Sequence, residues 1–211
     1  PDSNIDYLES FPDIIVCNSP AHLNQLAKRG VPKQKMIVGG ALRYSTPPAI
    51  ITVKTAPVFV ALSSDAEISR QILDAVKSVK RSGRVFFIKE HPMYPFAFKE
   101  TSDVRRTTKP LTAYKELSTV IYATGTVGLE SILAGLPTLR FMPQNKIAFD
   151  ILPDGLAAAT VTADELDNAL DHLPEPAKVS RSEYLAPVDI SLWKNLITDA
   201  SFVKTPGGLG S

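Results

Sequence analysis

Six short apolar runs set the strongest limit on the fold of this chain. Each is nearly unbroken and is rich in β-branched or aromatic residues. Runs of this kind are typical of strands that are buried on both faces of a parallel sheet. The predicted strands are residues 14–17, 36–40, 58–63, 85–90, 119–123 and 137–141.

Segments with helical patterns lie between these runs. Residues 19–30 begin with Ser19 as an N-cap followed by a proline, and they end in glycine. Thr162 and Glu165 have the spacing of a capping box. Because strands and helices alternate, we predict an α/β fold, with a Rossmann-like parallel sheet and helices on both faces. The other predicted helices are residues 64–83, a shorter segment at 109–117, 125–136, 162–173 and 190–197.

The composition excludes several classes of protein. The chain has 211 residues, of which 44% are hydrophobic, enough to bury the core of one or two domains. A net charge of +1 with interspersed charges gives no nucleic-acid-binding footprint. The single cysteine, Cys17, excludes an intrachain disulfide and fits a reducing compartment. The histidines lack the spacing of metal ligands, and no apolar run reaches the ~20 residues of a membrane span.

Residues 43–56 are the predicted domain boundary. They follow a Gly-Gly pair, contain two adjacent prolines and are followed by a third, a pattern typical of linkers. Arg43 opens this segment, either as a surface arginine beside a tight turn or as a residue that reaches a phosphate between two domains. Residues 201–211 are expected to form a flexible tail.

Two serines stand where the predicted strand 58–63 ends. In an open parallel sheet, ligands bind beyond the carboxyl ends of the strands, so residues at these points are candidates for a site. Ser63 and Ser64 either cap the helix that follows or present hydroxyl groups to a ligand.

The next predicted strand ends in a charged loop. Lys89, Glu90 and His91 directly follow four apolar residues, and Pro92 ends the strand. His91 is either a structural histidine or a group that donates a hydrogen bond to phosphate or moves a proton. The two other histidines of the chain lie in or near predicted helices and are expected to be structural or exposed to solvent.

A small-residue turn follows the predicted strand 119–123. Thr124, Gly125 and Thr126 supply backbone amides, two hydroxyls and a residue without a Cβ atom, and Glu130 lies about one turn into the next helix. The stretch matches neither GxGxxG nor the P-loop. From these residues alone it is either a tight connection from strand to helix or a phosphate cradle.

Together these motifs resemble the C-terminal, nucleotide-binding half of glycosyltransferases with the two-Rossmann (GT-B) architecture. "PDIIVCNSPAHLNQLAKRGVPKQKMIVGGALRY" is similar to the crossover segment of that group, "KEHP" to its His-Pro motif, and "TGTVGLESILAGLPTL" to its Ser/Thr-rich turn and helix. The bacterial members in question use CMP-activated sugars or CDP-glycerol to build capsule, lipopolysaccharide and teichoic acid. The resemblance covers roughly residues 10–175.

The resemblance implies a division into domains. Residues 1–45 would be the crossover from an N-terminal acceptor domain that is missing or truncated, and residues 46–200 the nucleotide-binding domain. The enzyme would be cytoplasmic, compatible with peripheral association with the inner membrane face. It would need neither metal nor cofactor, and its substrates would be a CMP-, CDP- or UDP-activated sugar or polyol and a glycan or lipid-linked acceptor.

The resemblance also implies roles for the site residues. His91 would contact the donor phosphate, or donate a proton, and electrostatic stabilisation of the departing phosphate would drive transfer. Glu130 would bind the ribose hydroxyls. The remaining implied donor-binding residues are Thr124, Gly125 and Thr126 for phosphate, Pro92 as the shaper of its loop, and Lys89, Ser63, Ser64 and Arg43.

Two other functions fit the same sequence. A UDP-N-acetylglucosamine 2-epimerase has a similar His-Pro strand end and a Glu-bearing helix after a small-residue turn. That family usually carries a Glu-Arg-Pro-Glu-like string where this chain has "RFMPQNKIAFD". An α/β module that binds a nucleotide or a partner without catalysis is the third hypothesis.

Overall fold

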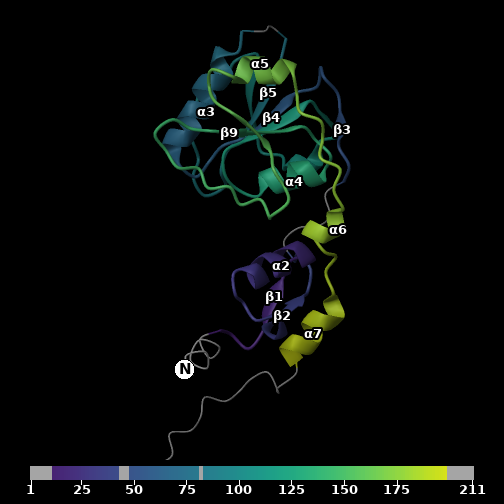
Figure 1. Cartoon of the computed structure of the whole chain (residues 1–211). Helices are drawn as coiled ribbons and strands as arrows, with labels where there is room; N and C mark the ends of the chain where they lie inside the picture. Colours follow the sequence, from purple (N-terminus) through teal and green to yellow (C-terminus); the bar gives the residue numbers. More distant parts are fainter. Residues whose placement is uncertain (1–10, 43–47, 81–82, 199–211) are drawn as a thin grey trace, which may run out of the picture. The chain divides into compact units, whose positions relative to one another are not determined.

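The computed structural model describes residues 11–42, 48–80 and 83–198, which belong to two compact units. The first contains the described residues among 1–46 and 180–211, and the second is Pro47–Val179. Each unit has its own parallel sheet (Figure 1).

The second unit is built on a six-stranded sheet in which every neighbouring pair of strands is parallel. Its spatial order is β10-β9-β8-β4-β5-β6. Numbered along the chain, this is the 3-2-1-4-5-6 order of the Rossmann fold, and the order reverses between β4 and β8. The strands are β4 (Val58–Ala61), β5 (Phe86–Lys89), β6 (Val104–Thr107), β8 (Thr119–Tyr122), β9 (Thr138–Phe141) and β10 (Ala159–Val161).

Both faces of this sheet are covered, so all residues of the central strands β4 and β8 are buried, and those of β4 are all apolar. Val58 and Val60 of β4 belong to one core, and Phe59 and Ala61 belong to the other. This alternation follows from the period of two along a strand. Helices α3 (Ala66–Ser78) and α5 (Leu166–Asp171) lie on the first face, and α4 (Val127–Leu133) on the second (Figure 1). The predicted fold class is confirmed.

A second, two-stranded sheet corrects one of the predictions. β3 (Ile51–Thr52) pairs in parallel with β7 (Glu116–Leu117), so the described residues of the segment 43–56 are attached to the second unit. The division between the two units, before Pro47, falls inside this predicted boundary segment. The Ile50 amide also donates to the carbonyl of Ala134 at 3.1 Å. The prediction of a helix over residues 109–117 is wrong. Only one 3₁₀ turn, Leu111–Ala113, forms there, and the chain then extends into β7.

The first unit follows the pattern expected from the sequence. It contains β1 (Ile15–Cys17), α2 (Pro20–Lys28), a 3₁₀ turn and β2 (Met36–Val38), with β1 and β2 parallel. Ser19 caps α2, since its hydroxyl accepts the amide of His22 at 3.1 Å.

The end of the described chain returns to this first unit, whereas the sequence analysis assigned residues up to 200 to the nucleotide-binding domain. Helices α6 (Arg181–Tyr184) and α7 (Ile190–Thr198) belong to it. The indole nitrogen of Trp193 donates to the Gly39 carbonyl at 2.8 Å. The Ala41 amide donates to the Ala186 carbonyl at 3.1 Å. These bonds satisfy backbone groups that follow β2.

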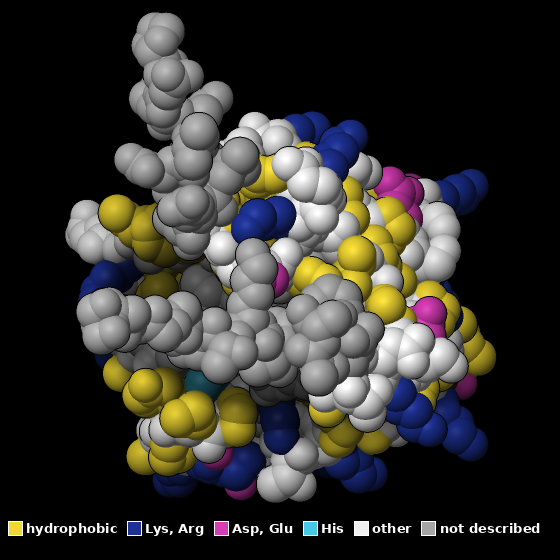
Figure 2. All heavy atoms as spheres, turned by 90° about the horizontal axis from the view of Figure 1, so that it is seen from below, with side chains coloured by type: hydrophobic (Ala, Val, Ile, Leu, Met, Phe, Trp, Pro, Cys, Tyr) yellow, Lys and Arg dark blue, Asp and Glu magenta, His cyan; other side chains and the backbone are white. Residues whose placement is uncertain are grey.

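Charge is spread over the face shown in Figure 2, where Lys and Arg side chains are scattered among hydrophobic and acidic ones. Within the described ranges, no helix is long and apolar enough to cross a membrane.

Candidate functional site

Most of the predicted site residues meet at one edge of the six-stranded sheet. The loops after β5, β4, β8 and β9 follow one another along the carboxyl edge, because this is the order of their strands. The strand order reverses between β4 and β8, and such a switch point opens a crevice for ligands in sheets of this kind.

Two hydroxyl groups meet across this switch point. Ser63 Oγ lies 3.2 Å from Thr124 Oγ1, although the two residues are 61 positions apart. Ser63 is buried, and its hydroxyl also accepts the Asp65 amide at 3.1 Å. The Ser63 carbonyl accepts the Ser69 hydroxyl at 2.9 Å, which fixes the serine from a second direction. The sheet thus brings together two groups that the sequence placed in separate motifs.

Helix α3 is capped by Asp65 rather than by either serine. Asp65 Oδ1 accepts the amides of Glu67 and Ile68 at 2.8 and 3.2 Å. The Lys146 ammonium donates to Asp65 Oδ2 at 3.0 Å, and this bond, with the capping bonds, lowers the pKa of Asp65. The capping interpretation of Ser63 and Ser64 was therefore wrong. Ser64 is exposed beside the switch point.

The turn after β8 leaves open space at its centre. Gly125 has a φ of +100°, and a Cβ atom placed on it would meet nothing within 4 Å. Only glycine adopts this backbone easily, so the sequence needs it for the conformation rather than for packing. The Thr126 hydroxyl donates to Glu130 Oε1 at 3.1 Å. Thr124, Thr126 and Glu130 are all half-buried at this edge.

The ring of His91 is oriented by its own loop. The Met93 amide donates to His91 Nδ1 at 3.3 Å, and the ring packs 5.2 Å from that of Tyr94. A neutral ring that accepts at Nδ1 carries its proton on Nε2. His91 is half-buried, whereas Pro92 beside it is exposed. The loop therefore presents an N–H donor at the carboxyl edge.

The neighbours of His91 fix the loop in place. Glu90 forms an ion pair with Arg106 of β6 and accepts the Phe96 amide at 3.1 Å. Lys89 Nζ donates to the Thr108 carbonyl at 2.6 Å. Lys89 thus bonds to the backbone that follows β6.

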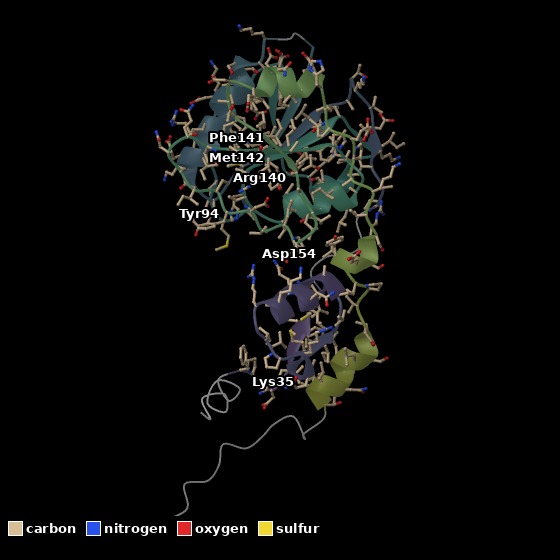
Figure 3. The ribbon with its side chains drawn as sticks, in the orientation of Figure 1. Lys35, Tyr94, Arg140, Phe141, Met142 and Asp154 are labelled. Carbon is tan, nitrogen blue, oxygen red and sulfur yellow. The ribbon has the colours of Figure 1, made fainter. Side chains whose placement is uncertain are left out.

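Two residues that sequence reasoning missed lie at the same edge. Tyr122 of β8 and Arg140 of β9 are register partners. Arg140 donates to the Ala148 carbonyl and lies 3.4 Å from Asp150 Oδ2, both in the loop after β9. The Tyr122 hydroxyl and Arg140 Nε are buried and find no hydrogen-bond partner among the described residues. Burial raises the pKa of Tyr122. Figure 3 labels Arg140 with its neighbours at the end of β9.

A signal for Arg140 was present in the sequence. Strands buried on both faces are nearly continuous in apolar residues, so an arginine inside "PTLRF" is an exception that needs a partner. Arg43, the remaining predicted site residue, lies outside the described residues.

A cavity of about 570 Å³ lies beside this edge, between α3 and the loop after β9. Of its two cationic side chains, Arg70 is paired with Glu67 and with Asp74, at 2.7 Å from the latter, and Lys146 is paired with Asp65. Both cations of this cavity are therefore already engaged by carboxylates.

No protein-family model matches the chain, and no curated protein matches it. Several solved structures, however, are similar to it in fold. The UDP-GlcNAc 2-epimerase of Methanocaldococcus jannaschii, in complex with UDP-GlcNAc and UDP, is 10% identical with a TM-score of 0.50, covering 88% of this chain and 61% of that one. The UDP-N-acetylglucosamine 2-epimerase of Rickettsia bellii is 12% identical with a TM-score of 0.47, covering 90% of this chain and 58% of that one.

The glycosyltransferase SnogD of Streptomyces nogalater is 13% identical with a TM-score of 0.39, covering 90% of this chain and 49% of that one. The chain spans less than two thirds of the length of each of these three structures. Likeness at such low identity concerns the fold. The Rossmann-like parallel sheet that the sequence predicted is confirmed by the strand order and by this likeness in fold.

Proposed function

We propose that Pro47–Val179 bind the nucleotide part of an activated sugar or polyol, as the donor-binding domain of a cytoplasmic glycosyltransferase. The acceptor would be a glycan or a lipid-linked molecule of a bacterial surface polysaccharide. The contact between Ser63 and Thr124 at the switch point carries the proposal, because it joins two polar loops where ligands of such sheets bind. The M. jannaschii epimerase structure, which contains UDP, supports a nucleotide as the ligand.

The proposed chemistry is stabilisation of a departing phosphate. The Nε2–H of His91 and whichever hydroxyl of Ser63 and Thr124 accepts from the other would donate to phosphate oxygens, which accumulate charge as the sugar leaves. Thr126 would join them by exchanging its bond to Glu130 for one to the phosphate. Hydrogen bonds to a charged group are about twice as strong as neutral ones, so hydroxyls and an imidazole suffice without a metal.

The other predicted residues have supporting roles in this proposal. Gly125 would let the phosphate approach the backbone, since its Cβ position is open. Glu130 would accept the ribose hydroxyls, and Pro92 would shape the His91 loop. Lys89 and the exposed Ser64 would add to the pocket from the ends of β5 and β4.

Titration calorimetry of the whole chain with UDP, CDP and CMP tests the proposal. We expect His91→Ala to weaken binding about tenfold, because one hydrogen bond to a charged group contributes about 1.5 kcal/mol. The matched control is His172→Ala, whose ring lies 3.1 Å from the Asn168 carbonyl and which we expect to bind normally. Absence of binding by all three nucleotides up to millimolar concentration would contradict the proposal.

The two alternatives are separated by the reaction itself. An epimerase converts UDP-GlcNAc into its 2-epimer without any acceptor, and NMR of the sugar would detect it. A binding module without catalysis would bind the nucleotide and leave UDP-GlcNAc intact both with and without glycan acceptors. The proposed transferase releases the nucleotide only when an acceptor is added.

A further inference from the structure

Two buried donors at the carboxyl edge lack an acceptor. The Tyr122 hydroxyl and Arg140 Nε have no hydrogen-bond partner within the described ranges of the chain, and Tyr122 is fully buried. Most buried polar groups in proteins are hydrogen-bonded, so each exception calls for an explanation. Because an oxyanion supplies only acceptors, it complements this pair of groups.

These donors lie beside the proposed phosphate loop. Tyr122 ends β8, two residues before Thr124. A Cβ atom on Gly128 would lie 2.7 Å from the Tyr122 hydroxyl, so this hydroxyl lies against the first turn of α4. Arg140 is the register partner of Tyr122 on the next strand. The position of these two donors and their chemistry therefore both fit a phosphate ligand.

Asp150 forms an ion pair with the guanidinium of Arg140. Its Oδ2 lies 3.4 Å from Arg140 Nη1, longer than the 2.7–2.9 Å of a charge-assisted hydrogen bond. Asp150 remains about one-third exposed, whereas Arg140 is 13% exposed. The pair is thus a loose one that leaves part of the guanidinium without a partner.

The first half of the loop is held independently of Asp150, whereas Asp150 Oδ1 accepts the Leu152 amide at 3.1 Å in the second half. Gln71 of α3 accepts the Gln144 amide at 2.7 Å and donates to the Gln144 carbonyl at 3.1 Å. Lys146 is bound to Asp65. Asp150 can therefore leave Arg140 while the first half of the loop stays attached to α3.

We infer that Arg140 and the Tyr122 hydroxyl form a phosphate subsite that the Asp150 carboxylate occupies until a ligand displaces it. This inference deepens the proposed function, because the anion is a phosphate of the same nucleotide. Asp150 then acts as an internal competitor, which lowers the affinity for the donor and releases it after transfer.

The chain contains a matched control pair at the opposite edge of the sheet. Arg84 precedes β5, donates to the Leu170 carbonyl at 2.9 Å and lies 3.3 Å from Asp171. Arg84 and Arg140 thus each bind one carbonyl and one aspartate. The Asp150→Asn and Asp171→Asn variants remove the same charge from the same protein, and only the first would open the subsite.

Calorimetry with inorganic pyrophosphate and with UDP, on the wild type and variants of the whole chain, tests the inference. Asp150→Asn should raise the affinity for pyrophosphate about three- to fivefold, the factor expected for removal of a weak competing ion pair. Asp171→Asn should leave it unchanged. Arg140→Lys should lower it about tenfold, since lysine cannot reproduce the guanidinium fork.

Each outcome decides between the claims. Equal affinities of Asp150→Asn and Asp171→Asn would overturn the inference, even if UDP binds and the proposed function survives. The expected pyrophosphate pattern without nucleotide binding would support the subsite and refute the nucleotide function.

If Asp150→Asn does not fold, hydrogen exchange of the wild type replaces the calorimetry of this variant. Pyrophosphate should then speed exchange at residues 148–152, and unchanged or slower exchange would overturn the inference.

Discussion

The amino and carboxyl edges of the six-stranded sheet use similar polar groups in different ways. At the amino edge, the buried Thr119 hydroxyl donates to the Pro137 carbonyl at 2.9 Å. Arg84 likewise binds the Leu170 carbonyl and Asp171. These side chains bind the backbone of the neighbouring connection, so their capacity is used by the fold itself.

At the carboxyl edge the polar groups leave capacity unused. Ser63 and Thr124 bind each other, while the Tyr122 hydroxyl and Arg140 Nε have no partner among the residues that the structure describes. Buried groups with unmet hydrogen-bonding capacity cost stability, and proteins tolerate them mostly where function needs them. The difference between the edges is therefore what favours the carboxyl edge as the proposed ligand-binding side of the sheet.

Thr119→Val tests the structural side and has the largest expected effect on stability. Valine has nearly the shape of threonine, so the change removes only the hydroxyl and its bond to Pro137. We expect the free energy of unfolding to fall by about 1 kcal/mol, the net value of such a bond, measured by urea denaturation. Affinity for pyrophosphate and UDP should stay at the wild-type value. A loss of affinity would break the distinction between the edges.

Tyr122→Phe is the matched change at the other end of β8. It removes a buried hydroxyl that has no partner, so the free energy of unfolding should stay within about 0.5 kcal/mol of the wild type or rise. Pyrophosphate affinity should nevertheless fall about threefold, because a donor to the anion is lost. Destabilisation comparable with that of Thr119→Val would show that this hydroxyl serves the fold.

Glu67→Gln on α3 has the smallest expected effect, which is a change in how stability depends on pH. The hydrogen bonds from Arg70 and then Gln71 lower the pKa of Glu67 from 4.5 to about 2. A carboxylate with a lowered pKa contributes stability above its unfolded value and loses it as the pH falls toward the folded one. The decline of melting temperature between pH 4.5 and 2 should therefore be shallower in the variant. Identical slopes in both proteins would contradict this.

Much of the fold could be predicted because its central strands are buried on both faces. The strands that were missed lie at the two margins of the sheet. β6 reads "VRRT" and only Val104 is buried, while β10 reads "ATV" and only Val161 is buried. One-sided burial over three or four residues leaves no apolar run to recognise. The prediction of a helix at 109–117 was wrong because the end of this segment pairs with β3, and this long-range pairing prevailed over local helix propensity.

The site was predictable to the extent that strand ends mark it. The sequence placed Ser63, His91 and Thr124 after their strands, and the parallel topology then brings these ends to one edge. The sequence could not predict the contact between Ser63 and Thr124, because this contact depends on β4 and β8 being neighbours in the strand order. Nor could it give the pair of Arg140 and Asp150, which depends on the path of a long loop.

The return of α6 and α7 to the first unit makes the second unit an insertion within it. Pro47–Val179 form one continuous stretch, whereas the first unit needs chain from both sides of that stretch. During synthesis all of the inserted stretch emerges before Trp193 can reach Gly39, and domains generally fold as units as they emerge. The second unit can therefore fold before the last helix of the first unit has been made. A protein truncated after Val179 would keep the whole second unit and lack part of the first.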